Sequence, residues 1–165
     1  MTHVLRSDAQ RNLGRVLEAA AEVFAERGPD ASVDEIARRA GVGHGTVFRR
    51  FPTKEALLQA VLLRRLEELT GLAAEADFER FFLAAAEAYR LDRALVDGLD
   101  RCVGAPALGA FVAAVERLVA QAQADGVLRR DVTAEDVLRL VPTASRYPAI
   151  VLDGLRPPKT ELSTT

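Results

Sequence analysis

Apolar residues recur at intervals of three and four along most of this chain, and no segment shows the strict alternation of a β-strand. The first clear run, which would share one face of a helix, is Leu13, Val16, Leu17, Ala20, Val23 and Phe24. Alanine, leucine, arginine and glutamate, which all favour helices, dominate the composition. We therefore predict an all-α protein, and its 165 residues allow one domain or a small domain joined to a larger one.

A short helix is predicted to begin near Ser32 and to end at Gly41. The SVDE sequence at its start has the pattern of a capping box, in which Ser32 accepts from the Glu35 amide and Glu35 reaches back to Ser32. Gly41 can end the helix in the left-handed conformation that glycine adopts without steric cost. A second helix is expected over about residues 44–50, with Gly43 as its cap. Two short helices joined by such a turn form a helix-turn-helix.

The second of these helices has an exposed face that suits a DNA major groove. Val47 and Phe51 are expected to point inward. The residues left on or near the exposed side are His44, Gly45, Thr46, Phe48, Arg49 and Arg50. Small residues, a hydroxyl, an aromatic ring and two guanidinium groups can contact bases and phosphates. The simpler interpretation is a solvated helix end, where arginines also suit the helix dipole.

The overall charge does not by itself predict a nucleic-acid partner. The chain carries 22 Lys and Arg against 24 Asp and Glu, a formal net charge of −2. In residues 1–60, Lys and Arg only slightly outnumber Asp and Glu. Any DNA-binding surface must therefore come from the local placement of its cations.

Several features favour a cytoplasmic protein with no membrane partner. The single cysteine, Cys102, excludes an internal disulfide. The beginning of the chain, MTHVLRSDAQRN, lacks the apolar centre of a secretory signal. No stretch approaches the ~18 to 20 apolar residues that a membrane helix needs.

No catalytic or metal-binding set is recognisable in the sequence. His3 and His44 have neither a nearby cysteine nor an acidic partner four residues on, so a zinc site is not expected. An acid/base pair, an activated nucleophile and a phosphate-binding loop are also missing. We therefore expect a non-enzymatic protein without a cofactor. The competing classes are an enzyme or metabolite-binding helical protein that has lost DNA binding, and a protein-binding adaptor.

More helices are predicted beyond the helix-turn-helix. Thr53 is a suitable N-cap for a long helix, and a shorter, less regular helix is expected around residues 92–102. Pro106 suits the start of a long helix that ends at Gly126. The TAED sequence that follows can cap another helix, which Pro142 is expected to cut short.

The predicted domains are a helix-turn-helix domain at 1–53, a helical body at 54–156 and a disordered, proline-rich tail at 157–165. Aromatic residues at helical spacing in the body usually form a core, but some can line a pocket for a small-molecule effector. The candidates for such a pocket are Phe78, Phe82, Tyr89 and Phe111.

The run VLEAAAEVFAERGPDASVDEIARRAGVGHGTVFRRFPTKEALLQAVL resembles the DNA-binding domain of TetR-family transcriptional regulators. The elements AAxxxFxxRG, IAxxAGV and GTVFRxFPxKExL, and farther along ADGVLRRDVTAEDVLRL, occur in the order of the family. The resemblance implies an all-helical homodimer that binds double-stranded DNA. It also implies a C-terminal domain that binds a small-molecule ligand, and a repressor that this effector releases from a pseudo-palindromic operator.

The resemblance further implies roles for individual residues. The start of the family's recognition helix, which contacts bases and phosphate, is occupied here by Gly43, His44, Gly45 and Thr46. Phe48 stands where the family often has a tyrosine whose hydroxyl reaches a phosphate, so a thymine-methyl or sugar contact is expected instead. Arg50, beside Arg49, replaces a frequent histidine and offers a longer, permanently charged arm. Lys54 and Ser32 match positions that bind the phosphate backbone.

The C-terminal end departs from the family pattern. Relatives pair two long C-terminal helices with those of a second subunit to form a four-helix bundle. Here the segment from Thr133 to Leu155 is too short for two such helices, and Pro142 and Pro148 interrupt it. We therefore expect a homodimer through C-terminal helices, with an abbreviated or differently built interface.

Overall fold

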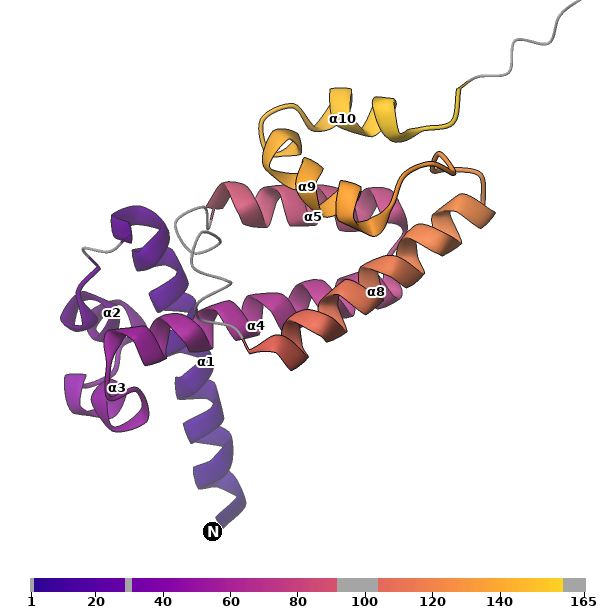
Figure 1. The fold of residues 1–165 in the computed structure, drawn as a ribbon. Coiled ribbons are helices and arrows are strands. Elements are labelled where there is room, and N and C mark those ends of the chain that lie inside the picture. The colour runs from indigo at the N-terminus through magenta and orange to yellow at the C-terminus, as the bar shows by residue number, and fades with distance from the viewer. Residues whose placement is uncertain (1, 29–30, 92–103, 159–165) are drawn as a thin grey trace, which may run out of the picture. The chain divides into compact units, whose positions relative to one another are not determined.

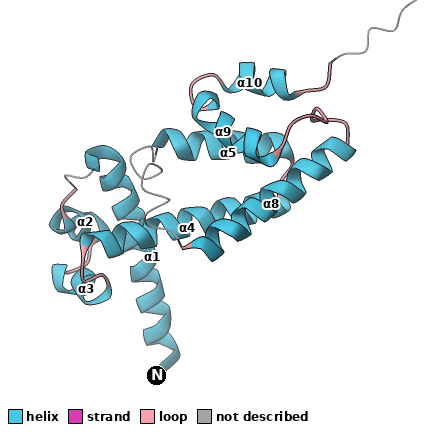
Figure 2. Cartoon of the chain, in the orientation of Figure 1, coloured by secondary structure: helices cyan, strands magenta, loops and turns pink. Residues whose placement is uncertain are grey.

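The computed structural model describes residues 2–28, 31–91 and 104–158, and these residues form eight helices and no strand (Figures 1 and 2). The all-α class predicted from the apolar spacing is therefore confirmed. The chain divides into two compact units, one made of residues 1–66 with 91–105 and the other of 67–90 with 106–165. The domain boundary expected after residue 53 stays a prediction.

The first unit contains the predicted helix-turn-helix. Its helices are α1 (Thr2–Arg27), α2 (Val33–Ala40), α3 (His44–Arg50) and the first part of α4 (Lys54–Glu75). Helix α2 packs beside α1, and α3 packs beside α2 (Figure 1). The core of this unit includes the buried side chains Val16, Ala20, Val23, Phe24, Ile36, Val47, Leu57 and Val61. Four of the six residues of the apolar face predicted for the first helix thus lie in this core, and the other two, Leu13 and Leu17, are half-buried.

The turn between α2 and α3 is closed by backbone hydrogen bonds, and Gly41 ends α2 in the left-handed conformation, as predicted. Gly41 has φ 65° and ψ 36°, in the left-handed region. Its N–H donates to the Arg38 carbonyl at 3.2 Å, and the Val42 N–H donates to the Ala37 carbonyl at 3.0 Å. The Arg15 guanidinium of α1 donates to the Gly41 carbonyl at 3.3 Å. The turn is therefore held both by α2 and by α1.

The capping box predicted at the start of α2 is wrong. Ser32 is the N-cap residue, with extended backbone at φ −98° and ψ 134°, but its side chain makes no capping hydrogen bond. The Glu35 carboxylate instead lies 3.5 Å from the Arg39 guanidinium and 3.7 Å from that of Arg27. Two guanidinium groups attract the carboxylate more strongly than one neutral backbone amide. The acidic member of the expected box is thereby drawn toward its cationic neighbours.

Helix α4 begins with the predicted cap. The Ala56 N–H donates to the Thr53 hydroxyl oxygen at 3.1 Å, and the Leu57 N–H donates to the Thr53 carbonyl at 3.2 Å. The first unit includes α4 as far as Leu66. Its buried side there is formed by Leu57, Val61, Leu62 and Leu66.

The second unit contains the last residues of α4 and, apart from the terminal residues Leu91 and Ala105, the helices α5 (Phe78–Leu91), α8 (Ala105–Ala124), α9 (Ala134–Ala144) and α10 (Pro148–Leu155). Its core includes the buried side chains Phe78, Phe81, Phe82, Phe111, Val115, Leu128, Val137, Leu152 and Leu155. The rings of α5 and α8 meet in this core, because the centroids of Phe81 and Phe111 are 6.4 Å apart.

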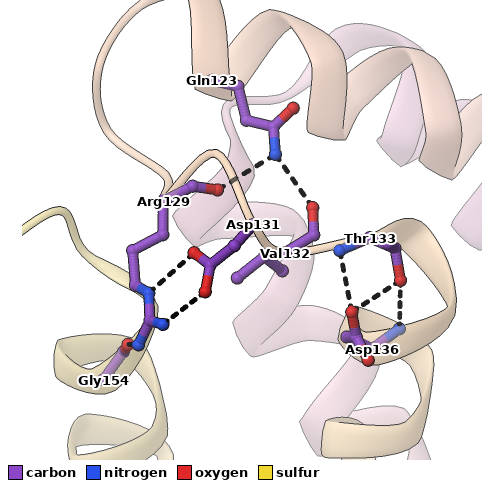
Figure 3. A network of polar contacts seen from close by, with 7 residues as sticks. All are labelled: Gln123, Arg129, Asp131, Val132, Thr133, Asp136 and Gly154. Carbon is purple, nitrogen blue, oxygen red and sulfur yellow. Dashed lines mark hydrogen bonds and ion pairs between the residues drawn. The ribbon is translucent and has the colours of Figure 1, made fainter.

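A polar network closes the turn between α8 and α9 (Figure 3). The Gln123 side-chain amide donates to the carbonyls of Arg129 at 3.0 Å and Val132 at 2.8 Å. The Arg129 guanidinium pairs with the Asp131 carboxylate and also donates to the Gly154 carbonyl of α10 at 3.3 Å. One glutamine thus holds the turn, and one arginine ties it to the end of α10.

Helix α9 has a complete capping box, but its proline does not end it where expected. The Asp136 N–H donates to the Thr133 hydroxyl at 3.1 Å, and the Thr133 N–H donates to the Asp136 carboxylate at 2.9 Å. The helix continues two residues past Pro142, to Ala144, so the expected stop at this proline is wrong. Because Pro142 has no N–H, the last turn lacks one backbone hydrogen bond. The Ser145 N–H still donates to the Val141 carbonyl at 2.9 Å and completes that turn.

The two C-terminal helices are short, as the sequence predicted, with 11 residues in α9 and 8 in α10. The helix expected around residues 92–102, the environment of Cys102 and the last part of the predicted tail lie outside the described residues. None of the helices in the described part of the chain combines the length and the apolar character that a membrane crossing requires.

Candidate nucleic-acid interface

Helix α3 is anchored to the first unit by a single buried side chain. Val47 is 1% exposed, and the Phe51 N–H donates to the Val47 carbonyl at 2.8 Å, with Phe51 itself half-buried. Gly43 is the N-cap residue of α3, as predicted. The other residues of the helix are all exposed, namely His44, Gly45, Thr46, Phe48, Arg49 and Arg50. The bounds and the outward face predicted for the second helix are therefore confirmed.

The two arginines of α3 carry positive charge that no carboxylate offsets within the described residues. The Arg49 Nε donates to the Gly45 carbonyl of its own helix at 3.2 Å, and this bond leaves its charge uncompensated. Arg50 makes no hydrogen bond or ion pair with the part of the chain that the structure describes. Arg39 of α2 differs, since it donates to both carboxylate oxygens of Glu26. An exposed, unpaired guanidinium pair is the arrangement that attracts phosphate.

A cavity of about 640 Å³ lies between α1 and α3. Its lining residues are Gln10, Asn12, Leu13, Val16, Thr46, Val47, Arg49, Arg50 and Phe51. The α1 side contributes the amides of Gln10 and Asn12, and the α3 side contributes both arginines. The sequence did not identify these two amides as site residues, because helical spacing assigns only the apolar positions of a helix. Their place beside α3 depends on how α1 packs.

A contact between α2 and α3 orients His44, the first side chain of α3. The His44 Nδ1 lies against the Asp34 Oδ1, and the His44 ring is stacked at a tilt of 31° on Phe48, with 4.5 Å between ring centroids. Phe48 is 42% exposed. The sequence placed Asp34 only inside a capping pattern and did not identify it as a partner of His44. Ten residues separate the two along the chain, and only the fold brings them together.

The predicted backbone-binding positions flank α3. Ser32 is exposed at the N-cap of α2, two residues before Asp34, and its hydroxyl is not used for capping. Lys54 is the first residue of α4 and is half-buried. The first turns of α2 and α3 meet at the contact between Asp34 and His44. Ser32 therefore lies near the exposed face of α3, while its role in binding stays a prediction.

The aromatic residues predicted for an effector pocket occupy the second unit. Phe78, Phe82 and Phe111 are buried and Tyr89 is half-buried. Phe78 and Phe82 stack with 5.8 Å between their ring centroids. A cavity of about 970 Å³ is lined by Asp77, Phe78, Glu79, Gly126, Val127, Leu152, Asp153, Leu155, Arg156, Pro157 and Pro158. Phe78 is the member of the predicted set that lines it.

Comparison with known proteins places these features in one family. Residues 16–61 match the model of the bacterial regulatory proteins of the tetR family. The HTH-type transcriptional repressor Rv3405c of Mycobacterium tuberculosis is 46% identical over 86 residues, which are 50% of this chain and 46% of that protein. This chain spans about half the length of the curated relatives that it matches.

Two solved structures match nearly the whole chain. The TetR transcription regulatory protein of Mycobacterium vanbaalenii is 38% identical, with a TM-score of 0.70, over 93% of this chain and 99% of that one. The TetR transcriptional regulator SCO0520 of Streptomyces coelicolor is 32% identical, with a TM-score of 0.61, over 88% of this chain and 98% of that one. Together with the helix-turn-helix and the exposed face of α3, these matches show that the chain belongs to the TetR family of DNA-binding transcriptional regulators.

Proposed function

We propose that this protein is a cytoplasmic one-component repressor that binds a pseudo-palindromic operator as a homodimer and is released by a small-molecule effector. It acts by binding alone, with no catalytic step and no cofactor. The observation that carries the proposal is the exposed face of α3. On this face, Arg49 and Arg50 have no carboxylate partner among the described residues. On the opposite side of the helix, Val47 is buried in the core of the first unit.

The proposed DNA contacts fall into two classes. The side chains of His44, Thr46 and Phe48 lie on the exposed face of the recognition helix and would meet base edges or sugars. The groups proposed to bind phosphates, through charge, hydroxyl or backbone amide, are Ser32, Gly43, Gly45, Arg49, Arg50 and Lys54. Phosphate contacts set the position on the duplex, whereas base contacts provide the sequence preference.

Repression is supported by one relative. The Mycobacterium tuberculosis protein that shares 46% identity over 50% of this chain is named a repressor. A homodimeric repressor needs two recognition helices that reach successive major grooves, roughly 34 to 36 Å apart or a multiple of that spacing. The operator is therefore expected to be pseudo-palindromic.

The proposed dimer interface uses α9 and α10 with the turn before them. Large apolar side chains are exposed in this part of the second unit, with Val127 at 52%, Tyr147 at 56% and Ile150 at 73%. Burying such side chains between two copies removes apolar surface from water. Because α9 and α10 are short, the interface is expected to be smaller than that of relatives with long C-terminal helices.

The proposed effector site lies in the second unit. The cavity of about 970 Å³ has room for a small molecule, and its apolar wall includes Phe78, Leu152 and Leu155. Phe82, which stacks on Phe78, is proposed as a further pocket residue, as are Tyr89 and Phe111. The effector would release the protein from the operator if it binds more tightly to a dimer conformation whose two recognition helices are not spaced to reach successive major grooves.

The proposal is tested by a mobility shift with the DNA upstream of the protein's own gene. The wild type should shift this DNA at nanomolar to micromolar concentrations, and the Arg49→Ala, Arg50→Ala double variant should lose most of the affinity. Arg117→Ala, an exposed arginine of α8 in the second unit, is the matched control and should bind as the wild type does. Equal binding by the double variant would show that α3 is not the DNA-binding element.

The homodimer is tested separately by light scattering on the purified protein. A mass near twice the 17.9 kDa of one chain is expected, and Ile150→Glu should reduce it toward one chain. A wild type of monomer mass at micromolar concentration would contradict the proposed dimer without affecting the assignment of α3.

A further inference from the structure

We propose that Asp34 of α2 sets the base preference of the recognition helix by holding the His44 imidazole in one tautomer. Asp34 is thus a positioning residue, and it acts on DNA through His44. This inference rests on the proposed function, because it requires that the exposed face of α3 meets DNA bases. The geometry that supports it can be measured without DNA.

The imidazole is held from two sides. Its Nδ1 contacts the Asp34 Oδ1, and one of its faces lies against the Phe48 ring, with 4.5 Å between centroids. A carboxylate has only acceptor atoms, so the nitrogen that it contacts must carry the hydrogen. The Nδ1 edge is thereby used inside the protein. The His44 side chain is 50% exposed, and we take Nε2, the nitrogen that Asp34 does not contact, as the atom that would meet an outside partner.

The tautomer decides what Nε2 can recognise. In a neutral imidazole with hydrogen on Nδ1, Nε2 carries a lone pair and is an acceptor. In the major groove the donors are the exocyclic amines of adenine and cytosine, whereas guanine and thymine present acceptor oxygens at the equivalent edge. A His44 fixed by Asp34 therefore selects adenine or cytosine at the base it meets. The opposite tautomer would select guanine or thymine.

The Asp34 carboxylate is poorly placed for affinity, and this supports a role in discrimination. Its side chain is 77% exposed beside the helix proposed to face phosphates, where a negative charge repels DNA. A group that weakens binding to every sequence while favouring one base raises specificity at the expense of affinity. The competing interpretation is that Asp34 only suits the N-terminal dipole of α2. That interpretation predicts an effect on stability and no effect on the His44 tautomer.

The first experiment measures the tautomer in the free protein by ¹⁵N NMR of the histidine side chains. The His44→Ala variant identifies the His44 signals, since the chain has only one other histidine, His3. In the wild type, the His44 signals should show hydrogen on Nδ1 and a bare Nε2. Asp34→Ala should shift the population toward hydrogen on Nε2. Glu55→Ala removes another exposed first-turn acid of the same unit and should leave the His44 signals unchanged. A wild-type His44 with hydrogen on Nε2, or on both nitrogens, would overturn the proposal.

The second experiment selects operators from a randomised DNA pool at one fixed salt concentration. The wild type should prefer adenine or cytosine at one or two positions by about tenfold, the typical size of a single direct base contact. Asp34→Ala should reduce this preference or turn it toward guanine and thymine, while its affinity for unrelated DNA rises. His44→Ala should lose the preference. Glu55→Ala should raise the affinity for all sequences without changing the base preference.

The two failures can be told apart. If Arg50→Ala weakens binding but Asp34→Ala and His44→Ala keep the wild-type base preferences, the Asp34 proposal is wrong and the proposed function stands. If the Arg49→Ala, Arg50→Ala double variant binds as the wild type does, both are wrong, because α3 does not then face DNA.

Discussion

The Arg39 guanidinium donates to both carboxylate oxygens of Glu26, at 2.7 and 2.9 Å. This bidentate pair joins α2 to α1, and the carboxylates of Glu22 and Glu35 lie 3.6 and 3.5 Å from the same guanidinium. Bidentate pairs fix orientation as well as distance. The orientation of α2 relative to α1 is therefore set partly by these ion pairs, in addition to the apolar core between the helices.

This pair should make the stability of the protein depend on pH in the acid range. The hydrogen bonds from Arg39 hold the pKa of Glu26 below its ordinary value of 4.5. A depressed pKa in the folded state means that the stabilisation is complete above about pH 4.5 and is lost as the pH falls through the folded-state value. The difference in Tm between the wild type and Glu26→Gln should be largest above pH 4.5 and vanish well below it.

Gly41→Ala should lower the free energy of unfolding by roughly 1 to 2 kcal/mol, the cost of placing a Cβ in the left-handed region. Space is not the cause, because the nearest atom to an added Cβ is the Arg15 Nη2 at 3.8 Å. Gly45→Ala is the matched control, since Gly45 lies within α3 and an added Cβ would meet nothing within 4 Å. It should be neutral or stabilising by up to about 1 kcal/mol. Urea unfolding of the three proteins checks this, and equal losses in both variants would contradict it.

Two N-cap residues should respond differently to the same deletion. Thr133→Ala removes a hydroxyl that accepts from the Asp136 N–H and should cost about 1 kcal/mol of stability. Ser32→Ala removes a hydroxyl that makes no capping bond, so it should cost much less stability. For DNA affinity the order should reverse, with a loss only for Ser32→Ala. Thermal unfolding measures the stability of the two variants, and fluorescence anisotropy measures their DNA affinity. A stability loss for Ser32→Ala as large as that for Thr133→Ala would show that the Ser32 hydroxyl does cap α2.

Arg50→Ala and Lys54→Ala should each weaken binding to specific and unrelated DNA alike. Removing one cation that neutralises a phosphate should reduce the slope of log affinity against log salt concentration by about 0.9. Titrations at several salt concentrations measure this slope. Arg117→Ala in α8 should leave it unchanged. An unchanged slope in both variants would show that these two side chains do not bind the DNA backbone.

Phe48→Tyr should increase DNA affinity about tenfold, or ~1.5 kcal/mol, by adding a hydroxyl that can donate to a phosphate. The position is 42% exposed, so the added oxygen needs no buried space. The stacking of His44 on the ring should be retained, because the new group adds only to the ring edge. The gain should be similar for all sequences, and an affinity below that of the wild type would mean that the ring packs closely against a sugar or thymine methyl.

The helix-turn-helix could be predicted closely from local sequence. The bounds of α2 and α3 and the left-handed Gly41 agree with the prediction, because the conformation of a glycine and the apolar position of Val47 can be read from the local sequence. The capping box at α2 could not be decided locally. Its outcome depends on Arg39, which lies one turn farther along the same helix, and on Arg27, which approaches from α1.

The sequence by itself determined the helical class, the family and the residues of α3 that face outward, since these follow from apolar spacing and from motifs whose residues are close along the chain. Only the tertiary structure decided the partners of those residues. The contact of Asp34 with His44 and the cavity that Gln10 and Asn12 share with α3 require two helices to pack side by side. Apolar periodicity specifies which face of a helix is buried, but it does not specify which polar groups of neighbouring helices then meet at the surface.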